Sequence, residues 1–157
     1  MGTLQEQLKK ARLLNPQRIN KAVFDYIRTL EPILAQLNRN QIEKNSSDIF
    51  GNPLGFYSKA TELITTQKAL LGGGKIKYEG DPFNLLDSGD FLKGLFAKVS
   101  NGFVLFDTTD PKKEEIFSNP NLLSTDIFGL TDENLKVFIQ VQVAPFLLRH
   151  IRKTIGI

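Results

Sequence analysis

Few side chains in this sequence could carry out acid–base or nucleophilic chemistry. The chain has one histidine, His150, and no cysteine, which removes thiolate nucleophiles, thiolate metal sites and disulfides. His150 lies between Arg149 and Arg152 near the end of an expected helix, where a cation complements the helix dipole. We therefore interpret His150 as a structural residue.

Three aspartates, Asp81, Asp87 and Asp90, lie close together and could bind a cation or act as paired carboxylates in a small hydrolase. Their spacing does not match the alternating ligands of a Ca²⁺ loop, and Asp-Pro and Asp-Ser-Gly are common in turns. The run from Gly72 to Lys75 lacks the spacing of a phosphate-binding loop. The sequence thus predicts no catalytic residue, no cofactor and no metal site.

Helical signals dominate the first part of the chain. Asn15-Pro16 is a helix start, with Asn as the cap and Pro at the first helical position. Apolar residues then recur at steps of three and four, which predicts one amphipathic helix to about Arg39, with a bend near Pro32. A weaker helix is expected over residues 4–14. Another is expected over residues 56–71, ending at three glycines, with an apolar side made of Ala60, Leu63, Ile64 and Leu70.

A β-hairpin is the clearest local signal. Asn101-Gly102, the preferred pair for a type I′ turn, separates two strand-like runs, 95–100 and 103–107. Pairing Val99 with Val104 places on the core face the residues Leu95, Ala97, Val99, Val104 and Phe106. The opposite face carries Phe96, Phe103 and Leu105, which is more apolar than a solvent face should be. Either another element or a partner is expected to cover it.

The other connections and the last helix follow from turn and cap signals. Residues 72–90 are predicted to form a long loop or partner-facing arm, with a short strand at residues 75–78. A short helix should run from Asp110-Pro111 to about Ser118. The C-terminal helix, residues 131–155, is capped by Thr131 and should be kinked by Pro145. Its apolar residues nearly encircle its middle, which predicts burial within the domain or between subunits.

Composition and charge set limits on the whole chain. Its 157 residues, 41% of them hydrophobic, suit a single domain over residues 1–157. The expected fold is α+β, with N-terminal helices, a central β-hairpin or small antiparallel sheet, and a long C-terminal helix. The N-terminus lacks the apolar stretch of a signal peptide, and no run of about 20 apolar residues could span a bilayer, so no membrane contact is expected.

Charge is distributed unevenly along the chain. The net charge is +4 over residues 1–44, −3 over residues 110–136 and +3 over residues 137–157. The basic ends suit either a solvated face or contact with a complementary protein surface. They lack the dense basic stripe with interleaved aromatics that is typical of nucleic-acid recognition, so specific nucleic-acid binding is disfavoured.

A short repeat links two distant parts of the chain. Ser47-Asp48-Ile49-Phe50-Gly51 recurs as Thr125-Asp126-Ile127-Phe128-Gly129, and each copy joins a turn-forming pair to two apolar residues and a glycine. Two interpretations remain open. Either each copy anchors a loop by inserting Ile and Phe into the core, or the copies are equivalent docking points for neighbouring subunits.

A succession of motifs surrounds the hairpin: Leu85-Leu86-Asp87-Ser88-Gly89-Asp90-Phe91, the two-stranded run, Asp110-Pro111-Lys112 and Asp126-Ile127-Phe128-Gly129-Leu130-Thr131. This order, over roughly residues 47–135, resembles small virion proteins encoded by tailed phages and prophages of Bacteroides-type bacteria. More distantly, it is similar to neck and tail-completion proteins of tailed phages. Those distant relatives usually end soon after a Pro-Phe-leucine block, whereas Pro145-Phe146-Leu147 lies inside the expected C-terminal helix.

The resemblance implies a non-catalytic component of the head-to-tail connection, such as a neck, connector or tail-completion protein. The leading hypothesis is a structural protein of the virion neck or tail, made in the host cytoplasm, that forms a homo-oligomeric ring and contacts portal, adaptor or tail proteins. The alternative is a nucleic-acid-binding accessory protein that uses its basic termini. The residues expected at interfaces are Phe96, Phe103, Leu105, Ile127, Phe128, Phe138, Arg149 and Arg152.

Overall fold

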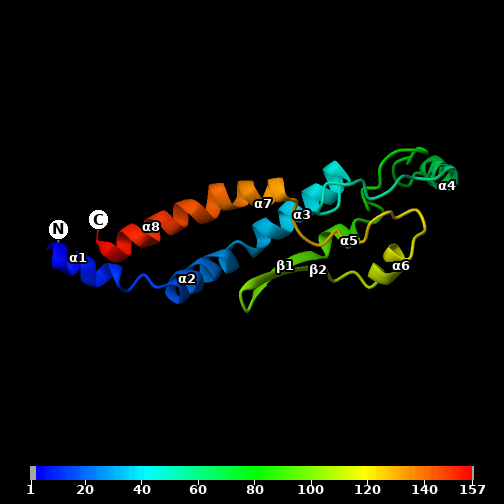
Figure 1. Cartoon of the computed structure of the whole chain (residues 1–157). Coiled ribbons are helices and arrows are strands. Elements are labelled where there is room, and N and C mark those ends of the chain that lie inside the picture. The colour runs from blue at the N-terminus through cyan, green and yellow to red at the C-terminus, as the bar shows by residue number, and fades with distance from the viewer. Residues whose placement is uncertain (1–2, 157) are drawn as a thin grey trace.

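The structure, a computed structural model, describes residues 3–156 and has an elongated α+β fold (Figure 1). Both ends of the chain lie at one end of the molecule, where the first and last helices are neighbours. Loops and short helices form the opposite end, and a β-hairpin lies beside the N-terminal helices. Within residues 3–156, no helix has both the length and the apolar character needed to cross a membrane.

The N-terminal helices are α1 (Leu4–Ala11), α2 (Pro16–Thr29) and α3 (Glu31–Asn45). Asn15 caps α2 as predicted, because its Oδ1 accepts a hydrogen bond from the backbone N–H of Arg18 at 2.9 Å. The prediction of a single helix is wrong, since the chain breaks at Leu30 and α3 then continues to Asn45. Pro32 explains the break: it has no N–H, and its ring would clash with the carbonyl group four residues earlier.

The hairpin is confirmed in both turn and register. β1 (Leu95–Ser100) and β2 (Phe103–Thr108) are antiparallel, with Val99 opposite Val104. Asn101 and Gly102 both have positive φ, as a type I′ turn requires. Val99 is buried on the core face, and its backbone N–H donates to Glu31 Oε1 at 2.7 Å, which ties the hairpin to the start of α3.

Three short helices flank the loops. α4 (Lys59–Leu70) and α6 (Lys113–Phe117) lie at the end far from the termini, and α5 (Asp90–Lys93) leads into the hairpin (Figure 1). α4 ends before the three glycines, as predicted. α6 begins later than predicted, because the Asp110 carboxylate accepts a hydrogen bond from the backbone N–H of Lys112 in a turn that precedes the helix.

Residues 72–89 form a long loop without the short strand predicted at residues 75–78, and Asp90, the last residue of the predicted loop, begins α5. The loop is attached to the body and does not stand free as an arm: Phe83 is buried, and its backbone N–H donates to the carbonyl oxygen of Gly55 at 2.9 Å. The segment around Asn121 also comes close to Gly55. Only glycine permits this, because the φ of Gly55 is +142° and a Cβ there would lie 2.1 Å from the carbonyl oxygen of Asn121.

The C-terminal helix is continuous and consists of α7 (Asp132–Phe138), a π-helical segment (Ile139–Val143) and α8 (Ala144–Ile155). Thr131 caps it as predicted, with its hydroxyl accepting a hydrogen bond from the backbone N–H of Asn134 at 3.3 Å. Pro145 is the second residue after the π-helical segment. The wider π-helical turn accommodates the proline ring and the missing N–H, so the predicted effect of Pro145 on the C-terminal helix takes the form of a local change of helix type.

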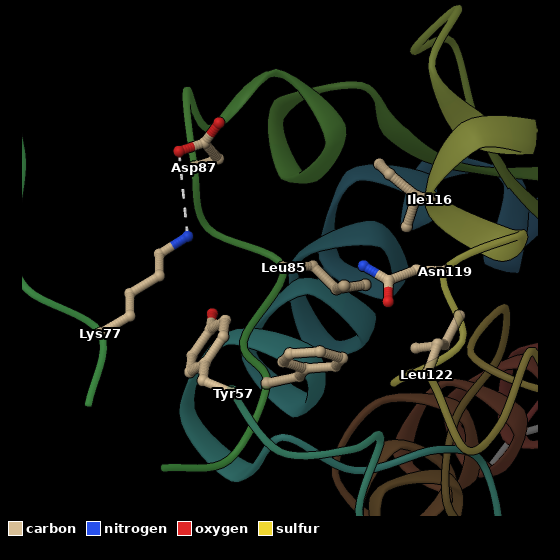
Figure 2. A pocket seen from close by; sticks show the side chains of 8 residues that line it. Tyr57, Lys77, Leu85, Asp87, Ile116, Asn119 and Leu122 are labelled. Atoms are coloured by element: carbon tan, nitrogen blue, oxygen red, sulfur yellow. Dashed lines mark ion pairs between the residues drawn. The ribbon is translucent and has the colours of Figure 1, made fainter. Parts of the chain in front are cut away.

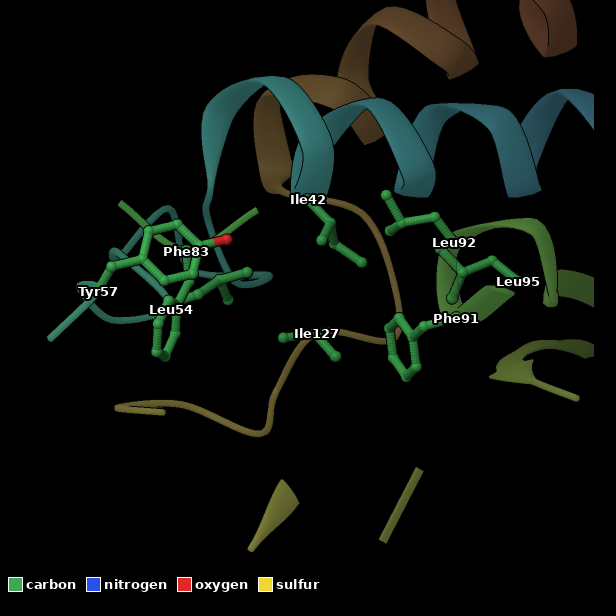
Figure 3. Packing of buried hydrophobic residues seen from close by; sticks show 8 residues of the cluster. All are labelled: Ile42, Leu54, Tyr57, Phe83, Phe91, Leu92, Leu95 and Ile127. Carbon is green, nitrogen blue, oxygen red and sulfur yellow. The ribbon is translucent and has the colours of Figure 1, made fainter. Parts of the chain in front are cut away.

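Two groups of buried side chains hold the fold together. The first joins the end of α3 to the loops and to α5, and it contains Ile42, Leu54, Tyr57, Phe83, Phe91, Leu92, Leu95 and Ile127 (Figure 3). The second joins α3, the hairpin and the C-terminal helix, and it contains Leu30, Leu34, Ala35, Ala97 and Phe138. Phe138 is therefore the side chain that fixes the start of the C-terminal helix to the core.

Candidate interaction surfaces

The residues predicted at interfaces divide into core and surface. Ile127 is fully buried and Phe138 is 4% exposed, so the prediction that they contact a partner is wrong: each fills a hydrophobic cluster of the chain itself. Phe128 is half-buried and packs against Phe91 and Phe117, so it too belongs to internal packing. The others remain at least partly exposed: Phe96, Phe103, Leu105, Arg149 and Arg152.

The two copies of the repeat meet beside the end of α3. The backbone N–H of Ile49 donates to the carbonyl oxygen of Asp126 at 2.9 Å. The copies are not equivalent, because Phe50 is 70% exposed while Phe128 packs against the core. Only the second copy anchors its loop through both apolar residues, so neither of the two interpretations holds for the pair.

Two buried amides of α3, Asn38 and Gln41, hold these segments in place, and no sequence pattern indicated them. Both are 1% exposed. Asn38 Nδ2 donates to the carbonyl oxygen of Gly129 at 2.7 Å. Gln41 Nε2 donates to the carbonyl oxygen of Asp48 at 3.2 Å, and Gln41 Oε1 accepts from the backbone N–H of Thr131 at 2.9 Å. The network therefore fixes the point at which the C-terminal helix begins.

Asp48 is a buried carboxylate within this region. Burial alone would raise the pKa of Asp48, but the backbone N–H groups of Asn52 and Phe50 donate to its Oδ1 at 2.8 and 2.9 Å. These hydrogen bonds hold the pKa of Asp48 below its usual value. Its charge is satisfied inside a turn, which indicates a structural role.

A small hollow of about 160 Å³ lies between Tyr57, the loop after α4 and α6 (Figure 2). Lys77 Nζ and Asp87 Oδ1 lie 3.9 Å apart at its rim, and Lys77 Nζ is 5.1 Å from the centre of the Tyr57 ring. Burial raises the pKa of Tyr57 and lowers that of Lys77. The two charged groups are too far apart for a hydrogen bond, and their neighbours Leu85 and Ile116 are apolar, so the hollow does not assemble a general acid–base pair.

The three aspartates considered from the sequence do not converge. Asp87 faces Lys77, while Asp90 Oδ2 accepts a hydrogen bond from the Ser88 hydroxyl at 2.6 Å. Asp81 uses its backbone carbonyl oxygen to accept the N–H of Tyr57. In the part of the chain that the structure describes, no three His, Asp or Glu side chains are grouped so that they could hold a metal ion.

The C-terminal helix is covered on one side only. Phe138 is buried in the core, and Phe146 stacks on Tyr26 of α2 with ring centres 4.1 Å apart. His150 in turn stacks on Phe146, which agrees with a structural role. An outer stripe faces solvent and consists of Val137, Val141 and Leu148.

An apolar groove of about 400 Å³ opens beside the start of the same helix. Leu135 and Ile139, both exposed, line one wall. The other walls come from α2, α3 and β2 and are also apolar, with Val23, Ile27, Leu34, Val104 and Phe106. This groove and the outer stripe are defined here as the two apolar surfaces of the C-terminal helix.

The structure brings the two basic ends of the chain together, since α1 packs against α8. Residues 3–29 and 144–156 carry nine basic and two acidic side chains, a net charge of +7, while the rest of the chain has a net charge of −4. Seven cations at this end form no ion pair with any residue from 3 to 156: Lys9, Lys10, Arg12, Arg18, Arg149, Arg152 and Lys153. The elongated molecule therefore has a basic end and an acidic remainder.

Comparison with known proteins adds no identification. No protein-family model, no curated protein and no solved structure matches this chain. Function must therefore be inferred from the surfaces of the molecule.

Proposed function

We propose that this protein is a virion assembly protein of a tailed phage and acts through protein–protein contacts, without catalysis. In this proposal it is a ring-forming component of the head-to-tail connection, located in the neck or tail region of the virion after synthesis in the host cytoplasm. Its partners are other copies of the chain and portal, adaptor or tail proteins. The resemblance of the motifs around the hairpin supports the virion setting.

One observation supports a role in protein–protein contact: the C-terminal helix packs against the rest of the chain on one side and leaves apolar side chains exposed on its other sides. Burying a Val or Leu side chain is worth roughly 1.5–3 kcal/mol. A partner that covered Val137, Val141 and Leu148 would therefore gain several kcal/mol, and contiguous apolar surface of this kind is typical of interaction sites.

The charge distribution supports contact between copies. The basic end formed by α1, α2 and α8 can meet the acidic remainder of a neighbouring copy, because the two carry net charges of +7 and −4. Contact between two basic ends would be repulsive. Arg149 and Arg152 lie exposed on this basic end, so charge reversal at both should weaken assembly in low salt while leaving the melting temperature nearly unchanged.

Light scattering of the purified chain across a wide range of concentrations tests the proposal. We expect oligomers of the wild-type chain, and we expect Val141→Glu to shift the equilibrium toward monomers, because Val141 is 61% exposed and a charge there would be buried on assembly. Gln140→Glu is the matched control, since it adds the same charge at an exposed neighbouring position. A wild-type chain that stays monomeric at every concentration contradicts self-assembly.

A second candidate function, binding to nucleic-acid phosphates, is favoured by the same basic end, because seven cations without ion pairs to residues 3–156 gather there from both ends of the chain. Each phosphate contact releases counterions, so such binding weakens steeply as salt rises. An electrophoretic shift assay with duplex DNA at low and moderate salt tests it, with Lys10→Glu/Arg152→Glu as the variant that should lose binding. No shift at low salt rules this function out.

A further inference from the structure

α4 turns its polar side to the body of the molecule and its apolar side to solvent. Thr65, its buried residue, accepts a hydrogen bond from the backbone N–H of Lys77 at 3.0 Å. On the same side, Glu62 Oε2 accepts from the backbone N–H of Glu79 at 2.7 Å. The other side carries four side chains that are 54–90% exposed: Leu63, Ile64, Leu70 and Leu71.

These four side chains form one stripe, here called the α4 stripe. Positions 63, 64, 70 and 71 are separated by one and seven residues, so they lie on the same face two helical turns apart. Figure 1 places α4 at the end of the molecule opposite to the termini, with loops beside it. An amphipathic helix that presents its apolar face to solvent is suited to insertion into a groove of a partner.

We propose that the α4 stripe of one copy docks into the apolar groove of a second copy; this rests on the self-assembly proposed above. The dimensions agree. Leu63 to Leu70 spans seven α-helical steps, or about 10 Å, and the groove wall from Leu135 to Val143 also spans about two turns, of which the second is π-helical. The groove volume of about 400 Å³ is also large enough for several side chains, because a cavity of about 150 Å³ accommodates a benzene molecule.

Charge favours this occupant over a second α4. α4 and the loop after it, residues 59–90, contain five acids and four bases, and four of the acids lie in residues 79–90, which contain no base. Beside the groove, α2 contains three bases and one acid, Asp25, which is already paired with Lys21 and Arg28. Docking α4 into the groove therefore brings an acidic segment toward a basic helix, whereas pairing two α4 helices would bring the acidic segments together.

The docked arrangement is head-to-tail, because the α4 stripe and the groove are different surfaces of the same molecule. Such a heterologous contact leaves one free stripe and one free groove after every addition. The assembly closes into a ring when a whole number of such rotations from one copy to the next makes a full turn. The α4 stripe and the groove are thus the contact through which the ring would form.

A mixing experiment tests the contact. Leu70→Glu changes the stripe at a side chain that is 82% exposed, and Ile139→Glu changes the groove wall. Each variant alone should need on the order of tenfold or more protein to assemble, since each loses a buried apolar side chain and gains a buried charge. An equimolar mixture should give a finite 1:1 complex, because one intact stripe then meets one intact groove. Leu123→Glu, on an exposed loop leucine, is the matched control and should assemble like the wild type.

The outcomes separate this contact from self-assembly in general. If the wild-type chain and Leu70→Glu assemble equally well, and Leu71→Glu does the same, the α4 stripe is not an interface, while self-assembly stands. If both single variants fail to assemble and their mixture also fails, the stripe and the groove are not partners. A wild-type chain that remains monomeric overturns both proposals. Circular dichroism and melting temperatures establish that each variant is folded.

Discussion

Replacing Gln41 by alanine should destabilise the protein far more than the position of Gln41 in a long polar helix suggests. The side-chain amide is buried and bonds the backbone of two distant segments, at Asp48 and at Thr131. Gln41→Ala leaves the Thr131 N–H without its acceptor, which costs about 1–3 kcal/mol, and removes the hydrogen bond to Asp48, worth about 0.5–1.5 kcal/mol. The Asp48 carbonyl oxygen keeps a second donor, the N–H of Gly51 at 3.1 Å. The expected loss in the free energy of unfolding is therefore about 2–4 kcal/mol.

Gln36→Ala is the matched control, because it makes the same substitution on the same helix at an exposed site. The amide of Gln36 bonds only surface side chains, those of Asn40 and Arg39, so we expect a change within about 0.5 kcal/mol. Urea denaturation followed by circular dichroism measures both variants, and hydrogen exchange at the Thr131 amide reports the local effect. Equal losses in the two variants would refute the idea that Gln41 anchors the C-terminal helix.

Three further predictions concern stability. Gly55→Ala should lower the free energy of unfolding by about 2 kcal/mol or more relative to the loss caused by Gly51→Ala, as measured by denaturant titration. Both glycines have positive φ, but of these two only Gly55 would place the new Cβ on a backbone oxygen. In the folded state the pKa of Asp48 lies below its reference value of 3.8, so on acidification the carboxylate of Asp48 is protonated in the unfolded chain before it is protonated in the folded chain. The free energy of unfolding therefore falls as the pH drops below about 4, and Asp48→Asn should flatten that part of the acid-denaturation profile. An unchanged profile would contradict the lowered pKa of Asp48. Val99→Asp should cost about 3 kcal/mol or more because it buries an unpaired charge, whereas Lys98→Asp on the exposed face should leave the melting temperature nearly unchanged.

The features that the sequence predicted correctly depend on a few neighbouring residues. The hairpin turn needs two residues that tolerate positive φ, and Asn101-Gly102 is such a pair. The caps at Asn15 and Thr131 need only a side-chain oxygen within reach of an N–H three residues later. Short-range geometry determines all of these, so a single sequence is sufficient to find them.

The features that were missed depend on contacts between distant segments. The sequence predicted one helix to about Arg39 with a bend near Pro32, whereas the chain breaks at Leu30 and α3 runs on to Asn45, because periodicity alone does not mark where a helix ends. Asn38 and Gln41 look like ordinary solvent-facing residues until the loop at residues 125–131 folds against them. No local pattern distinguishes a buried amide that bonds backbone groups from one that faces water.

The most instructive difference concerns which apolar side chains face inward. Ile127 and Phe138 were predicted at an interface and are core residues, while Leu63, Ile64 and Leu70, predicted as the apolar side of a helix, face solvent. The free-energy gain from removing an apolar side chain from water is the same in a domain core and in an interface, so both select the same residue types. Sequence can therefore count the apolar faces of a helix but cannot assign each face to the chain itself or to a neighbour. In this fold, α4 and the C-terminal helix are among the helices with apolar surface that the chain does not cover, and they are the two elements that the proposed head-to-tail contact would bring together.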